Sequence, residues 1–172
     1  MKTETPRDLF FDQLLDLFSV ENQLKSSLPT LANRAENGQL ASLLLSHLGE
    51  TERHPETVSR LLTWHGYKSG VDTSKAMEGL ISGGDAHLDN MDVTTTRGLM
   101  IIAHCLRIEH YEVAACTITS TLAQQLGFAE EAMVLKNILQ QERGAADTLT
   151  RLQPTLYDVA TNISPDYKGA VQ

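Results

Sequence analysis

The chain lacks any long apolar run, and it has fewer basic than acidic residues. No segment reaches the roughly 20 consecutive apolar residues that a spanning helix needs, and the longest uncharged stretch, 113–129, is rich in Thr, Ser and Gln. The N-terminal MKTETPRDLFF has neither the apolar core nor the cleavage site of a secretory signal. Lys and Arg number 14 against 22 acidic residues, giving a net charge of −8. Without a basic run to neutralise phosphates, we expect neither a membrane nor a nucleic-acid partner.

Cysteine is also scarce. The 172 residues contain only Cys105 and Cys116. On one helix these two residues would lie roughly 16 Å apart along the axis, whereas a disulfide needs Cα atoms within about 7 Å. We therefore expect two free thiols, which favours the reducing cytoplasm as the location.

Strict polar–apolar alternation is absent, whereas helical periodicity is persistent. The spacing predicts four long helices over 5–37, 39–64, 94–127 and 129–153, with a short helix around 74–81 in a long crossover, 66–92. Pro29 and Pro55 are expected to bend their helices, Gly83-Gly84 to break the short helix, and Pro154 to stop the last long one.

Short, long and short connections in that order predict an all-α, ferritin-like up-down-down-up four-helix bundle with one long crossover. The whole chain, 1–172, is expected to form a single ferritin-like domain. Its core would cover 5–153 and leave a C-terminal tail, 154–172.

Polar residues interrupt the apolar face of each predicted long helix near its middle. The interrupting residues are Glu21 in the first helix, His47, Glu50 and His54 in the second, Glu109 and Glu112 in the third, and Glu142 in the fourth. Nearly the same number of residues separates Glu21 from Glu50 as separates Glu112 from Glu142. On two antiparallel hairpins, each pair would lie at one height, so the two halves resemble copies of one hairpin.

An ionised carboxylate buried without a partner costs several kcal/mol, and no basic residue on these faces can compensate. Two divalent cations would balance the charge, and a carboxylate-rich set favours iron, or alternatively manganese, over zinc or copper. The predicted ligands of the two metal ions are Glu21, His47, Glu50, Glu109, Glu112 and Glu142. For His54 and Asp147, the sequence leaves two roles open: ligating a metal or orienting a residue that does. The alternative is a bundle with a polar layer and no metal.

Other reactive side chains are expected to have ordinary roles. We interpret His65, His87, His104 and His110 as surface or core histidines. Tyr111 would point away from its acidic neighbours. Cys105 and Cys116 share a face with Glu109 and Glu112, but such buried cysteines usually serve packing.

Five segments resemble a known family, the YciF-like bacterial stress-response proteins of the ferritin-like superfamily. The segments, in order over about 5–153, are FSVENQL, HLGET, AMEGLI, IEHYEVA and LQQERGAADTLTRL. The resemblance implies a helical bundle, a dimetal centre and a homodimer. The implied ligands are Glu21, Glu50, Glu109, Glu112 and Glu142, with His47 in the same motif as Glu50.

The chain also departs from related patterns. The ferritin-like Glu-x-x-His motif is absent, because Arg53 follows Glu50 at the third position and Ala145 follows Glu142. Gln141 precedes Glu142 where the family often has a second acid. Ferritin's iron oxidation and storage are therefore not carried over to this chain.

Two functions are consistent with these patterns. The first is a di-iron or di-manganese stress-response protein that acts on peroxide or oxygen, or that sequesters metal. The second is a non-catalytic helical-bundle dimer with a structural or interaction role. A ferritin-type storage shell is a weaker third option, and the sequence leaves open whether the protein is an enzyme.

Overall fold

The fold is described by a computed structural model covering residues 3–70, 72–92 and 96–163. These residues form six helices and no strand. The helices are α1 (Pro6–Arg34), α2 (Gly38–Thr51), α3 (His54–Trp64), α4 (Lys75–Asp89), α5 (Arg97–Gln125) and α6 (Ala129–Ile163). None of them is long and apolar enough to cross a membrane.

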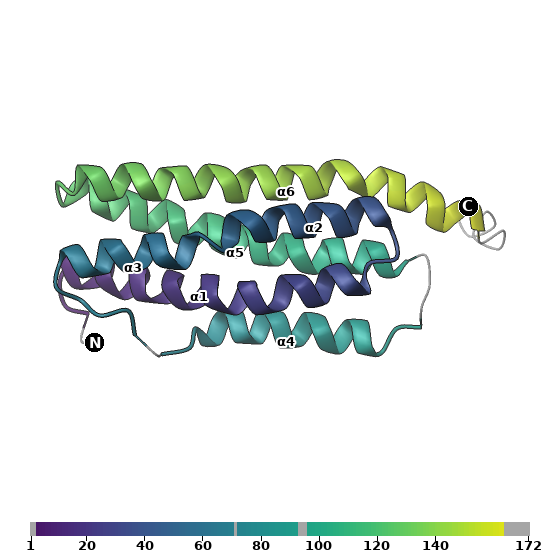
Figure 1. Cartoon of the computed structure of the whole chain (residues 1–172), viewed down its shortest axis with the longest axis horizontal. Coiled ribbons are helices and arrows are strands. Elements are labelled where there is room, and N and C mark those ends of the chain that lie inside the picture. The colour runs from purple at the N-terminus through teal and green to yellow at the C-terminus, as the bar shows by residue number, and fades with distance from the viewer. Residues whose placement is uncertain (1–2, 71, 93–95, 164–172) are drawn as a thin grey trace.

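The helices form an up-down-down-up bundle (Figure 1). Helices α2 and α3 follow one another along a line and run antiparallel to α1, while α5 runs antiparallel to α6. The long crossover between α3 and α5 contains α4, which packs on the outside against α5 and α1. This topology is the one that the connection lengths predict.

The first helix begins and continues as the sequence predicts. The Thr5 side chain accepts a hydrogen bond from the Asp8 amide at 3.1 Å, and the Thr5 amide donates to the Asp8 carboxylate at 2.9 Å. This reciprocal capping box satisfies two otherwise unpaired amides, and Pro6 opens the helix. Pro29 lies inside α1 without ending it.

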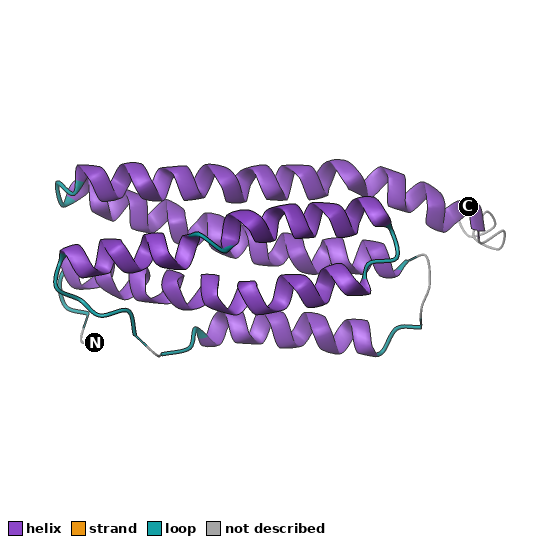
Figure 2. Ribbon diagram, in the orientation of Figure 1, coloured by secondary structure: helices purple, strands orange, loops and turns teal. Residues whose placement is uncertain are grey.

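The second predicted helix is broken rather than bent. Helix α2 ends at Thr51 and α3 begins at His54, with Pro55 in the first turn of α3 (Figure 2). Proline lacks an amide hydrogen and clashes with the preceding turn, so a new helix starts here instead of the old one continuing.

Two predicted helix ends are wrong. Helix α4 continues through Gly83-Gly84 to Asp89. A Cβ atom at Gly84 would lie 2.0 Å from the His104 ring, so this glycine serves close packing between α4 and α5. Helix α6 continues past Pro154 to Ile163, because Leu156 and Ala160 extend its buried face. The rest of the predicted tail, 164–172, lies outside the described residues.

The apolar core is divided into two clusters. One cluster contains Phe10, Leu14 and Leu17 of α1 with residues of α3, α5 and α6. The other contains Leu24, Leu28 and Leu31 of α1 with residues of α2, α4, α5 and α6. Glu21 lies on α1 between the two clusters, where it marks a polar layer across the middle of the bundle.

Candidate metal centre

Four glutamates are fully buried in the polar layer. Glu21 and Glu142 are 0% exposed, and Glu109 and Glu112 are 1% exposed. They come from α1, α6 and α5, whose apolar faces the sequence predicts to be interrupted at these positions. Acidic side chains are almost never buried to this degree without a partner.

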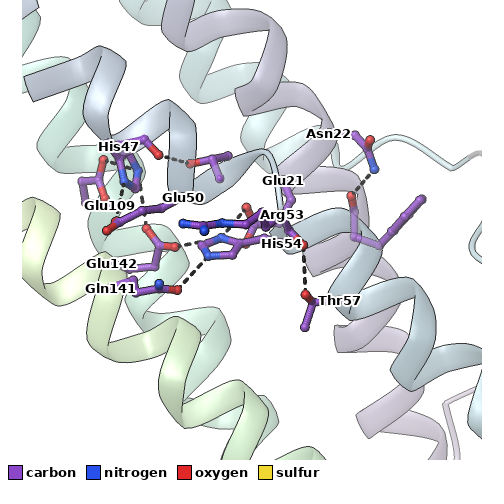
Figure 3. Close-up of polar contacts among 12 residues, drawn as sticks. Glu21, Asn22, His47, Glu50, Arg53, His54, Thr57, Glu109, Gln141 and Glu142 are labelled. Atoms are coloured by element: carbon purple, nitrogen blue, oxygen red, sulfur yellow. Dashed lines mark hydrogen bonds and ion pairs between the residues drawn. The ribbon is translucent and has the colours of Figure 1, made fainter. Parts of the chain in front are cut away.

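The buried side chains form two groups that share the carboxylate of Glu142, which faces both His47 and His54 in Figure 3. Within each group, one potential ligand atom per residue lies within 4.8 Å of the others. The first group is His47, Glu109, Glu112 and Glu142, and the second is Glu21, His54 and Glu142. The structure therefore brings together five of the six predicted ligands and adds His54 to them.

Glu142 spans the two groups with its two oxygen atoms. Its Oε2 lies 3.5 Å from His47 Nε2, and its Oε1 lies 3.3 Å from His54 Nδ1. His47 Nε2 is also 3.3 Å from Glu109 Oε1, while His54 Nδ1 is 3.1 Å from Glu21 Oε2. Each histidine thus faces one oxygen of Glu142 and one further carboxylate.

Many polar atoms of these groups have no hydrogen-bond partner among the described residues. They are both carboxylate oxygens of Glu112 and of Glu142, Oε1 of Glu21, Oε2 of Glu109, and both ring nitrogens of His47. Each unpaired buried polar atom costs about 1–3 kcal/mol, and native structures contain only a few. Oxygen and imidazole donors that converge without partners suit two divalent cations.

Burial changes the protonation of the acidic groups. It raises the pKa of Glu142 to about 8, an effect to which the neighbouring Glu21 adds. Burial, together with the charge of Glu142, raises the pKa of Glu109 and of Glu112 well above 4.5. Burial also raises the pKa of Glu21. Without metal, the layer therefore holds protons near neutral pH.

The two histidines respond in opposite ways. Burial, with His54 nearby, lowers the pKa of His47 to about 4, so His47 is neutral and able to ligate at physiological pH. Burial also disfavours the charged form of His54. The hydrogen bond and charge of Glu21, and then the charge of Glu142, outweigh that effect and raise the pKa of His54 to about 9. A protonated His54 is thus a cation within the metal-free layer.

Gln141 orients His54. Its Oε1 lies 2.9 Å from His54 Nε2, and an amide oxygen only accepts hydrogen bonds, so Nε2 carries the hydrogen. The other nitrogen, Nδ1, then faces the carboxylates of Glu21 and Glu142. Once His54 loses its second proton, this hydrogen bond keeps the remaining hydrogen on Nε2 and leaves Nδ1 free, an arrangement typical of metal-ligating histidines. In the sequence, the position of Gln141 next to Glu142 is the only signal of this role.

Glu50 lies apart from both groups. Its side chain is 41% exposed, and its Oε2 lies 3.9 Å from His47 Nδ1. The predicted Glu21–Glu50 pair is not formed, because the break between α2 and α3 brings His54 against Glu21 instead. The other predicted pair, Glu112 and Glu142, lies within one group.

The remaining candidates lie outside the polar layer. Asp147, His87 and His110 are exposed. His65 pairs with Glu131 at 2.6 Å, and His104 is buried against Gly84 of α4. The Tyr111 hydroxyl donates to Asp16 at 2.7 Å and so points away from its acidic neighbours, as predicted. Cys105 and Cys116 are buried free thiols, as predicted.

Comparison with known proteins gives one family and close structural relatives. The family described as "Domain of unknown function (DUF892)" matches residues 5–161. Protein YciF of Escherichia coli K12 is 32% identical over 156 residues, which cover 88% of this chain and 92% of that protein.

Three solved structures share the fold. The E. coli stress protein YciF has a TM-score of 0.86 at 30% identity, covering 91% of this chain and 99% of its own. YcfI of Rhodopseudomonas palustris, provisionally described as a structural protein, has a TM-score of 0.82 at 28% identity. The match covers 86% of this chain and 94% of YcfI. A Xanthomonas campestris protein has a TM-score of 0.71 at 20% identity, covering 89% and 94%, which shows the fold alone. The chain therefore belongs to the DUF892 family and is YciF-like over nearly its whole length.

Proposed function

We propose that this chain binds two divalent metal ions, iron or alternatively manganese, in the middle of its bundle. The observation that carries the proposal is the pair of buried ligand groups that share Glu142, in which most of the carboxylate oxygens and both ring nitrogens of His47 have no hydrogen-bond partner among the described residues. The proposed role is a stress response, acting on peroxide or oxygen or sequestering metal. The related E. coli YciF is described as a stress protein.

Each ion has its own ligands and one in common. His47, Glu109 and Glu112 would hold the first ion, Glu21 and His54 the second, and Glu142 both. Glu50 would join the first ion from the exposed side of His47. The four buried carboxylates carry a charge of −4 when ionised, which two divalent cations balance.

The bound ions would supply a Lewis acid or a redox partner for peroxide or oxygen. The chain's own residues prepare that chemistry. His47 is held neutral by burial, Gln141 turns His54 Nδ1 toward the carboxylates, and Glu142 fixes the two ligand groups side by side. The apolar clusters on both sides of the layer exclude water and so strengthen its electrostatic interactions.

Elemental analysis tests the proposal directly. Protein produced in iron- and manganese-replete medium should carry about two metal ions per chain, the number that two ligand groups allow. An anomalous X-ray signal would identify the metal and its ligands. A folded chain that binds neither iron nor manganese under these conditions would contradict the proposal. Peroxide consumption by the loaded protein, against the metal-free protein, separates turnover from sequestration.

A structural or interaction role without catalysis is the second candidate. It is favoured by the provisional description of the relative YcfI as a structural protein. In that case, replacing Glu109 by Leu would raise the melting temperature, since an apolar residue would replace an unpaired buried acid. A chelator would then leave the wild-type melting temperature unchanged.

The homodimer and the cytoplasmic location stay predictions. Gel filtration with light scattering checks the first, and a mass far above that of a dimer would favour a storage shell instead.

A further inference from the structure

A cavity of about 380 Å³ lies between α2 and α6 and reaches the polar layer. Its lining includes Ser46, Gln140, Gly144 and Arg151, which are exposed. It also includes the buried candidate ligands His47 and Glu109, with the half-exposed Glu50. The cavity therefore extends from the surface to the first ligand group.

Small residues keep this part of the α2–α6 contact open. Gly144 and Ala145 line the cavity from α6, and Ser46 lines it from α2. A Cβ atom added at Gly144 would meet no atom within 4 Å, in contrast to Gly84, where it would meet His104. Glycine in a helix costs about 0.8–1.0 kcal/mol relative to alanine, and at Gly144 no close packing accounts for it.

The cavity fits a hydrated cation in size and charge. Six water molecules at about 30 Å³ each occupy roughly 180 Å³, so the volume of the cavity is large enough for a hexahydrated divalent ion. The carboxylate of Glu50 borders the cavity, and Glu109 lies at its buried end. The positive Arg151 is directed along its own helix, with Nη2 3.4 Å from Thr148 Oγ1.

Two further cavities formed by the described residues do not reach the candidate ligands. Both lie beside α1 and the crossover and are lined by neither group of candidate ligands. Glu21 and His54, the ligands on that side of the layer, are 0% and 4% exposed. The approach between α2 and α6 thus connects solvent to the layer at the His47 side.

We propose that this cavity is the route by which a hydrated divalent cation enters and leaves the centre, with Glu50 as the first carboxylate that it meets. This inference rests on the proposed metal-binding function. Glu50 would replace a water of the incoming ion before His47 and Glu109 replace others. Blocking an entry route slows both the uptake and the release of the metal ion and leaves the affinity of the centre for that ion unchanged. This combination is what the experiment measures.

The test fills the cavity from Gly144. In a series Gly144→Ala, Gly144→Leu and Gly144→Phe, Mn²⁺ uptake is followed by stopped-flow mixing with a fluorescent indicator, and Mn²⁺ release by transfer to excess EDTA. A matched series at Gly79 provides the control, since Gly79 is also exposed within a helix with no atom near an added Cβ. Leucine is a better helix former than glycine, so the Leu variants should fold at least as stably as wild type.

We expect uptake and release to slow together as the side chain at position 144 grows, by about tenfold for Gly144→Phe. The bound Mn²⁺ per chain and the dissociation constant should stay at their wild-type values, and the Gly79 series should exchange at wild-type rates. Wild-type exchange rates in a folded Gly144→Phe and Gly144→Leu would overturn the route. Reduced affinity at an unchanged uptake rate would overturn it as well. Absence of Mn²⁺ and Fe²⁺ binding by the wild type would instead overturn the metal-binding function itself.

Discussion

The two hairpins of the bundle supply the polar layer in different ways. The hairpin of α5 and α6 consists of two uninterrupted helices and contributes three fully buried carboxylates. The hairpin of α1 with α2 and α3 is broken in its second arm and contributes one buried carboxylate and two histidines. The sequence suggests equal halves, each with a pair of glutamates at one height, and the structure shows that the halves are unequal.

The break in the second arm explains the difference. In one continuous helix, His47, Glu50 and His54 would share a face, because residues three and four apart are neighbours. Ending α2 at Thr51 and restarting at His54 lets each histidine face a different ligand group, while Glu50 remains half exposed. The continuous hairpin therefore supplies most of the negative charge. The broken hairpin supplies the two imidazoles and, at Glu50, the side of the layer that reaches solvent.

The largest expected effect comes from the residue that serves both groups. Glu142→Ala should weaken the binding of both ions by about 100-fold or more, so that both are lost on dialysis. Glu21→Ala, on the other hairpin, should leave one ion per chain. Elemental analysis after dialysis measures both, and Asp147→Ala, an exposed acid on the same helix as Glu142, is the control that should keep two ions. If Glu142→Ala and Glu21→Ala lose the same single ion, Glu142 does not span the groups.

The second prediction concerns the pH dependence of the metal-free protein. A carboxyl group whose pKa is raised by folding stabilises the fold fully below its ordinary value of 4.5. That contribution is lost as pH rises through the folded value, which is about 8 for Glu142. His54, with its pKa raised from 6.5 to about 9, acts in the same direction above pH 6.5.

Metal-free protein should therefore lose stability between pH 6.5 and 8.5, by about 1.4 kcal/mol per pH unit for each proton released. Thermal unfolding in EDTA should show a fall in melting temperature of about 5–10 °C over this range. The metal-loaded protein should show a smaller fall, because its carboxylates are ionised at both pH values. A melting temperature in EDTA that rises with pH would contradict this view of the layer.

A smaller effect is expected at Gln141. Gln141→Leu removes the acceptor that holds His54 Nε2, so the affinity of the Glu21–His54 group should fall about tenfold, while the His47 group keeps its affinity. Gln141→Glu retains an acceptor oxygen and should restore most of the loss. Calorimetric titration resolves the two binding steps, and NMR of the His54 ring nitrogens reports the tautomer. Equal weakening by Leu and by Glu would show that the hydrogen bond does not matter.

The smallest effect is expected at Glu50. Because this side chain is half exposed, Glu50→Gln should weaken only the ion of the His47 group, by less than about tenfold, and two ions should still bind at saturation. Glu52→Gln, an exposed neighbour, is the matched control. If Glu50→Gln removes an ion outright, Glu50 moves inward on binding, and the two hairpins then contribute more equally than the structure shows.

The sequence predicts most of the fold because its apolar periodicity and connection lengths are unambiguous. It also predicts the four buried glutamates, since each interrupts an otherwise apolar face. It could not rank Glu50 against His54, because both lie on the same face of a continuous helix, and Pro55 predicts a disturbance there without deciding between a bend and a break. The continuation of α6 past Pro154 and of α4 through Gly84 depends on distant partners, the buried surroundings of Leu156 and the His104 ring.

The division of the core into two apolar clusters restricts how protons can travel. Loading the layer with cations must displace the protons that burial keeps on its carboxyl groups, and those protons have to reach solvent. Along the bundle axis the layer is flanked on both sides by mainly apolar clusters, which carry protons poorly. The opening between α2 and α6 is polar where it meets His47, Glu50 and Gln141. Metal ions that enter the layer and protons that leave it would then pass through the same opening between α2 and α6, rather than through the ends of the bundle.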